Sequence, residues 1–86
     1  MFIQTETTPN PASLKFLPGR VVMEKGTADF RSVKEASNSL FAQNLFKIEE
    51  VEGVFFGSDF ISITKSESID WQVLKPSILG AIVDHY

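Results

Sequence analysis

Two short segments near the start of the chain are predicted as strands, in which alternate residues share a face. They are Phe2–Glu6 and Ser13–Leu17, and in the second of them Leu14 and Phe16 share one face. After a Pro-Gly break, Arg20–Lys25 predicts a third short extended piece. We therefore expect two or three strands in the first third of the chain.

The first two segments are separated by a proline-flanked connector that contains Pro9, Asn10 and Pro11. Neither proline can donate a ladder hydrogen bond, and each pushes its predecessor toward extended geometry. Asn10 can add a local side-chain turn. The connector is therefore a margin of the sheet, and two roles remain open for it: protection of a sheet edge, or an exposed epitope that binds a protein.

The middle of the chain changes to a helical period. Ser32 followed by Glu35 has capping-box spacing and predicts a short helical turn. An amphipathic helix is expected near Ser39–Lys47, with Asn38 or Ser39 as its N-cap. Its apolar face repeats at helical spacing through Phe41, Leu45 and Ile48.

The segment VEGVFFGSDFISITK predicts a β-hairpin. With its tip at Ser58 and Asp59, the register pairs Phe56 with Ile61, Val54 with Ile63, and Glu52 with Lys65. A tip shifted by one residue would place Asp59 on the apolar face, which is costly. The preferred register leaves two aromatic side chains on the opposite face, Phe55 and Phe60.

A second helix is expected after Asp70, which is placed to cap it. Its apolar stripe consists of Trp71, Leu74, Ile78 and Ile82, widened by Leu79, Val83 and Tyr86. Pro76 leaves two alternatives: a helix that bends there, or a separate turn followed by a helix that starts at the proline.

Strands joined mostly by hairpins, with a few helices to cover them, predict an α+β fold of two layers. We expect a mostly antiparallel sheet with the helices packed on one face, formed by residues 1–86 as a single domain. A chain of 86 residues is too short for a second core.

Charge and composition narrow the classes of function. Eight basic residues are spread singly against eleven acidic ones, for a net charge of −3, which argues against binding of nucleic acid. No apolar run approaches the roughly 20 residues that cross a bilayer, so we expect no membrane partner. The opening residues lack the features of a signal or transit peptide, which favours the cytoplasm of a bacterium.

Candidate chemistry is sparse. The chain has no cysteine, which excludes thiolate catalysis and Cys-ligated metal centres within these residues. His85 is the one histidine and is expected at a frayed, solvated helix end; no serine lies in a nucleophile elbow. We therefore expect no catalytic residues and no enzyme. A cation site formed by oxygen ligands is the alternative, and its candidates are Glu49, Glu50, Glu52 and Asp59.

The aromatic residues offer both a core and a docking surface. Trp71 is expected in the core, whereas Phe55 and Phe60 are the better candidates for contact with a partner, since they lie opposite the apolar hairpin face.

Three separated segments resemble the N-terminal domain of the Nfu family of iron–sulfur cluster scaffold and carrier proteins, which are related to NifU. They are MFIQTETTPNPASLKFLPG, FFGSDFISITK and DWQVLKPSILGAIVDHY. The resemblance implies a second domain with a Cys-x-x-C motif that holds a [4Fe–4S] cluster, so the cluster is expected only there and no cofactor in this chain. The end of the chain within an apolar helix favours a piece cut from a longer protein.

The resemblance further implies a non-catalytic accessory role in iron–sulfur cluster assembly. The expected partners are other assembly proteins or recipient apo-proteins, with Pro9, Asn10, Pro11, Phe55 and Phe60 as candidate contacts. The rival hypothesis is an independent domain that binds iron or another divalent cation through the carboxylates named above.

Overall fold

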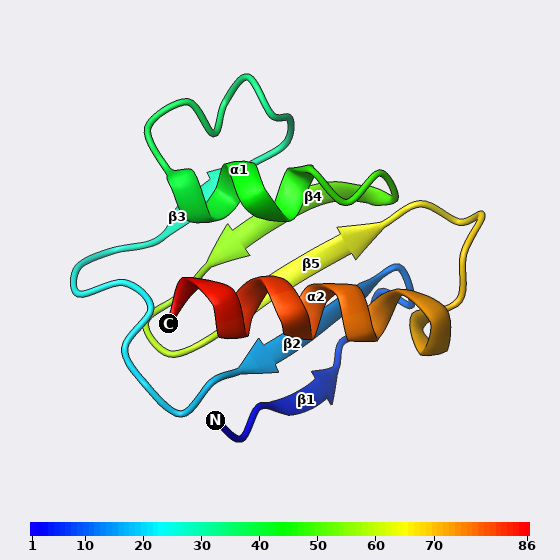
Figure 1. Ribbon diagram of the computed structural model, residues 1–86, viewed down its shortest axis with the longest axis horizontal. Coiled ribbons are helices and arrows are strands. Elements are labelled where there is room, and N and C mark those ends of the chain that lie inside the picture. The colour runs from blue at the N-terminus through cyan, green and yellow to red at the C-terminus, as the bar shows by residue number, and fades with distance from the viewer.

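The chain folds into a five-stranded sheet with two helices on one side of it. The computed structural model describes residues 1–86. The elements in chain order are β1 (Gln4–Thr7), β2 (Ser13–Leu17), β3 (Ala28–Phe30), α1 (Leu40–Phe46), β4 (Val51–Phe56), β5 (Ile61–Lys65) and α2 (Trp71–His85). The strand order is β1-β2-β5-β4-β3, and all neighbours are antiparallel. Both helices lie on the same side of the sheet in Figure 1, which confirms the predicted two-layer α+β fold.

The centre of the sheet is formed by β2 and β5, which are far apart in sequence. The predicted alternation of β2 is confirmed, because Leu14 and Phe16 are buried while Ser13, Lys15 and Leu17 are only half-buried. Leu14 pairs with Ile63 and Phe16 with Ile61. All four side chains belong to one core of fourteen buried residues between the sheet and the helices.

The hairpin β4–β5 follows the predicted register over most of its length. Phe56 pairs with Ile61 and Val54 with Ile63, as expected. The predicted pair of Glu52 with Lys65 is wrong: Val51 occupies that place, and the register shifts between Val51 and Gly53. The shift is a β-bulge, in which one extra residue of β4 has no partner across the ladder.

The third extended segment also differs from the prediction. Residues 20–25 form no strand; the edge strand β3 lies at Ala28–Phe30 instead. The backbone N–H groups of Val22 and Met23 both donate to Ser58 O, at 2.8 and 3.3 Å, so they are used in a loop contact and not in a ladder. Gly26 then turns the chain with a φ of 67°. In addition, β1 begins at Gln4 and not at Phe2.

The first helix begins where its cap predicts. Of the two expected N-cap residues, Ser39 takes the position, in extended geometry, and its Oγ accepts from Ala42 N at 3.1 Å. Before it, Glu35 N donates to Ser32 Oγ at 3.3 Å and to Ser32 O at 3.1 Å, so the predicted turn forms. The chain does not continue from that turn into a helix.

The second helix is one element of fifteen residues. Its predicted stripe is confirmed at Leu74, Ile78 and Ile82, which are all fully buried. Asp70 occupies the N-cap as expected, but its side chain makes no capping hydrogen bond. Pro76 lies within the helix, so the alternative of a separate turn before it is wrong. The proline removes one backbone donor from the helix.

Candidate functional site

The sheet face turned away from the helices is the first candidate surface, and we call it the open face. Residues paired across an antiparallel ladder lie on the same face, so the register defines it. The open face comprises Gln4, Glu6, Ser13, Lys15, Leu17, Asp29, Phe55, Ser62 and Thr64, together with Phe60 beside them. Ser13 and Thr64 hydroxyls are 3.0 Å apart and hydrogen-bonded, so part of this face is polar.

An aromatic pair marks the open face. The rings of Phe55 and Phe60 stack with centroids 6.0 Å apart and planes inclined by 22°. Lys15 Nζ lies 4.4 Å from the centroid of the Phe60 ring, within cation–π range. Both rings are half-buried. The two rings lie on the face of the sheet that does not carry Val54 and Phe56, as the hairpin pattern predicts. The sheet holds them in fixed positions.

The pair is able to stack because position 57 is a glycine. A Cβ atom built on Gly57 would overlap the ring of Phe60. The Phe60 ring thus lies directly over the backbone of the hairpin turn, and Gly57 itself is buried beneath it.

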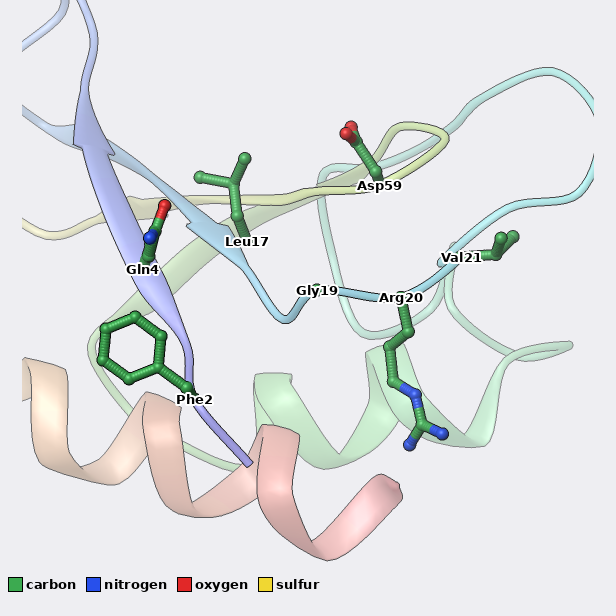
Figure 2. A pocket seen from close by; sticks show the side chains of 7 residues that line it. All are labelled: Phe2, Gln4, Leu17, Gly19, Arg20, Val21 and Asp59. Atoms are coloured by element: carbon green, nitrogen blue, oxygen red, sulfur yellow. The ribbon is translucent and has the colours of Figure 1, made fainter.

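A hollow of about 490 Å³ adjoins one end of the open face (Figure 2). It is lined by Phe2, Gln4, Leu17, Gly19, Arg20, Val21 and Asp59. Leu17 and Asp59 point to one side of the chain segment that contains Gly19, while Arg20 points to the other, toward α2 (Figure 2). Phe2 is 78% exposed, which is unusual for so large an apolar side chain.

Among the residues that line this hollow, only Asp59 was a candidate from the sequence; the six that were missed are Phe2, Gln4, Leu17, Gly19, Arg20 and Val21. Gly19 has a φ of 77° and redirects the chain after β2, which brings Arg20 and Val21 beside the first strand. The Pro-Gly break was visible in the sequence, but the direction of the chain after it was not.

The connector with Pro9, Asn10 and Pro11 is a compact turn between β1 and β2. Asn10 Oδ1 accepts from Ala12 N at 3.0 Å, so the expected local side-chain turn forms. All three candidate residues are exposed. The indole N–H of Trp71 donates to Pro11 O at 3.1 Å, and this bond ties the turn to the start of α2.

Trp71 is half-buried, as a partial member of the core. Its ring meets the edge of Phe16 with centroids 6.2 Å apart, and it packs against the buried cluster. Lys65 Nζ lies 5.8 Å from the indole. The predicted core role of Trp71 is confirmed for the part of the ring that packs against Phe16 and the buried cluster. The rest of the side chain bonds to the turn through the indole N–H and lies near Lys65.

The structure separates the candidate cation ligands. Glu49, Glu50 and Glu52 line a polar hollow of about 270 Å³ with Ser66 and Ser68. Asp59 lies at the other end of β4, beside the hollow of Figure 2. No group of three or more His, Asp or Glu side chains is arranged to hold a metal ion.

His85 is exposed in the last turn of α2, as the expected solvated helix end predicts, but its ring is not free of contacts. Its ring stacks on Phe41 of α1 with centroids 3.9 Å apart and planes inclined by 4°. Tyr86 meets the same Phe41 edge-on, and Arg20 lies over the Tyr86 ring at 4.9 Å. Burial raises the pKa of the Tyr86 phenol above its ordinary value, and the Arg20 charge offsets part of that rise.

Neither helix combines the length and the apolar character that crossing a bilayer requires. The chain has no cysteine, so it supplies no thiolate for an iron–sulfur cluster.

Comparisons with known proteins agree with this fold. Residues 3–86 match the family described as "Scaffold protein Nfu/NifU N terminal". The chain is 52% identical over 86 residues to NifU-like protein 4, mitochondrial, of Arabidopsis thaliana, covering 100% of this chain and 30% of that protein. It is 53% identical over 87 residues to the human NFU1 iron-sulfur cluster scaffold homolog, mitochondrial, covering 100% and 34%.

A solved structure is similar as well. The solution NMR structure of a NifU-like protein from Saccharomyces cerevisiae aligns with a TM-score of 0.82 at 29% identity, over 96% of this chain and 76% of that one. The fold and surface define a small α+β module without cluster ligands of its own. The chain belongs to the Nfu/NifU family of iron–sulfur cluster scaffold proteins and corresponds to their N-terminal domain.

Membership of this family bears on two expectations, the place of the cluster ligands and the cellular location. The chain spans about a third of the length of the curated relatives it matches, and the family's cluster-binding Cys-x-x-C lies in a separate domain, as expected. The expected location in a bacterial cytoplasm is wrong, because relatives at 50–53% identity from a plant and from human are mitochondrial proteins.

Proposed function

We propose that this chain is a single, non-catalytic recognition domain in iron–sulfur cluster assembly and delivery. In this role the open face binds another assembly protein or a recipient apo-protein, and so positions a cluster-bearing domain. The observation that carries the proposal is the Phe55–Phe60 stack on the sheet face that no helix covers.

The open face has the composition of a protein contact. Aromatic side chains held on rigid strands contribute much of the binding energy in interfaces, because little side-chain entropy remains to be lost. Lys15 adds a cation directly over Phe60, and hydroxyl groups of Ser62 and Thr64 supply hydrogen bonds around the rings. This arrangement favours a partner with an apolar centre and a polar rim.

The hollow of Figure 2 extends this contact surface. Phe2, Leu17 and Val21 offer apolar walls for one side chain of a partner, and Asp59 offers a negative charge at the margin, whereas the Arg20 guanidinium is turned toward α2 and lies over Tyr86. The turn with Pro9, Asn10 and Pro11 lies at the opposite end of β1 and is a second, smaller point of contact in this proposal.

A domain of this kind acts through effective concentration. When the partner is bound to this domain, a linked cluster domain meets it in an intramolecular event. The rate of cluster delivery rises without any new chemistry. The scaffold character of the family supports the absence of catalysis.

A chimera tests the proposal. This chain replaces the matching 87 residues of the human relative, and cluster transfer to an apo-ferredoxin of the [4Fe–4S] type is followed by absorbance. We expect transfer by the chimera, and a loss of about tenfold in its rate for Phe55→Ser with Phe60→Ser, as for residues central to an interface.

The matched control is Val33→Ser, which removes an exposed apolar side chain from a loop outside the open face. This variant should transfer clusters at the unchanged rate. Equal rates for the control and the open-face variant, with both proteins folded, would contradict the proposal.

A further inference from the structure

The outer side of the helix layer, opposite the open face, carries unusually little charge. Among the fifteen residues of α2, only Lys75, Asp84 and His85 are ionisable. Val73 is 66% exposed and Val83 50% exposed on this helix. The other exposed residues of α2 are Gln72, Pro76, Ser77, Gly80, Asp84 and His85, so the ionisable side chains of its outward face are confined to the last turn.

A groove of about 460 Å³ lies between the two helices. The wall that we call the α1 wall is formed by the end of α1 and the residues after it, namely Asn44, Lys47 and Ile48. The α2 wall is formed by Ser77, Gly80, Ala81 and Asp84. The α2 wall is thus built of small residues up to its last turn. A Cβ atom built on Gly80 meets nothing within 4 Å, so the groove is open at this point. Small residues at such a place allow another helix to approach closely.

The two walls carry opposite charges. Lys47 stands on the α1 wall and Asp84 on the α2 wall, and neither takes part in an ion pair, since the one salt bridge of the chain joins Arg31 and Asp29. A two-fold rotation exchanges the walls between two copies. Lys47 of each copy then faces Asp84 of the other, so the groove is complementary to itself.

We propose that the α1–α2 groove is the interface of a two-fold symmetric dimer of this chain. In the dimer the α2 wall of each copy lies against the α1 wall of the other, the small residues around Gly80 allow this close approach, and two Lys47–Asp84 ion pairs form between the copies. This inference goes beyond the proposed function and concerns the other side of the molecule.

Sedimentation equilibrium over a concentration series tests the dimer. We expect the wild-type chain to dimerise, and Lys47→Glu or Asp84→Lys each to weaken dimerisation about tenfold or more, because each creates two like-charge contacts. The double variant restores both contacts and should dimerise like the wild type. A mixture of the two single variants should form heterodimers, because each mixed pair again joins opposite charges.

Steric and charge controls complete the experiment. Gly80→Leu should block dimerisation, while circular dichroism shows an unchanged fold, because the added side chain has free space in the monomer. Lys34→Glu makes the same charge change on an exposed loop residue outside the groove and should leave the dimer unaffected.

Recovery of dimers in the mixture of the two single variants would show that the charge reversals act between two copies and not within one chain. A wild-type chain that stays monomeric throughout the series overturns the proposal and leaves the groove to a partner of another sequence. A dimer that ignores both charge reversals, or fails to recover in the mixture, overturns it as well. The open-face variants should not alter the mass, so this result is independent of the cluster-transfer experiment.

Discussion

Trp71 Nε1 donates a hydrogen bond to Pro11 O over 3.1 Å, although the two residues are 60 positions apart in sequence. The bond joins the turn between β1 and β2 to the first residue of α2. It explains why a tryptophan stands at a helix start where its ring is only half-buried: one edge packs against Phe16 and the polar edge holds the turn.

Trp71→Phe should remove this bond and keep most of the ring contact. We expect the free energy of unfolding to fall by about 0.5–1.5 kcal/mol, the usual net value of one hydrogen bond. Urea denaturation measures the change, with Val33→Ala as the control because that side chain is exposed and makes no such contact. A loss no larger than that of the control would show that the bond contributes nothing.

Helix capping should distinguish two residues that look equivalent in the sequence. Ser39→Ala removes a cap that accepts from Ala42 N, and should cost about 1 kcal/mol. Asp70→Ala removes a side chain that makes no capping bond, so we expect only the electrostatic part, a few tenths of a kcal/mol. Thermal denaturation of both variants tests this order, and an equal or larger effect at Asp70 would contradict it.

Two glycines should respond to alanine in opposite ways. Gly57→Ala places a methyl group against the Phe60 ring, so the ring must move and its stack with Phe55 is lost, at a cost of about 1 kcal/mol. Gly80→Ala has free space within a helix and should stabilise the monomer by about 1 kcal/mol. Chemical unfolding gives both values, and aromatic proton shifts report the stack.

The single tyrosine should make stability fall at alkaline pH. Burial raises the pKa of Tyr86 in the folded state, so the folded chain keeps the phenol proton at pH values where the unfolded chain has lost it. The resulting stability is complete below the unfolded pKa of about 10 and is lost as pH rises from there through the folded pKa. Tyr86→Phe should abolish this decline, measured by urea unfolding at a series of alkaline pH values.

Ferrous iron added under anaerobic conditions should cause no saturable, localised NMR shifts at Glu49, Glu50 and Glu52. The three carboxylates border a shared hollow but are not arranged to hold an ion together. Magnesium serves as the diamagnetic comparison; because ferrous iron broadens nearby signals even in weak contact with surface charge, saturation and not the size of the response marks a site. A saturating response to iron alone would restore the cation-binding alternative.

Local patterns predicted the parts of the fold that depend on neighbours in sequence. The alternation around Leu14 and Phe16, the helical stripe of Leu74, Ile78 and Ile82, and most of the β4–β5 register are confirmed, because each follows from burial of one face. The same reasoning predicts Phe55 and Phe60 together on the opposite face, where their rings stack.

Features that depend on distant contacts were not predictable in this way. Val22 and Met23 look like strand residues, but Ser58 O takes both of their N–H groups, and that contact arises only in the folded chain. The β-bulge beside Gly53 shifts the pairing register by one residue. The apolar pattern of the hairpin does not reveal this shift. The stack of His85 on Phe41 requires two helices to meet, which a position near the chain end does not indicate.

The place of β5 between β2 and β4 has a consequence for synthesis on the ribosome. While residues 61–65 are still inside the exit tunnel, the native pairing available to the earlier strands is limited to two separate pairs, β1 with β2 and β3 with β4. Each pair presents an unpaired inner edge, open to association with other nascent polypeptides. Protection by a chaperone is therefore most valuable just before this last strand emerges and closes the gap.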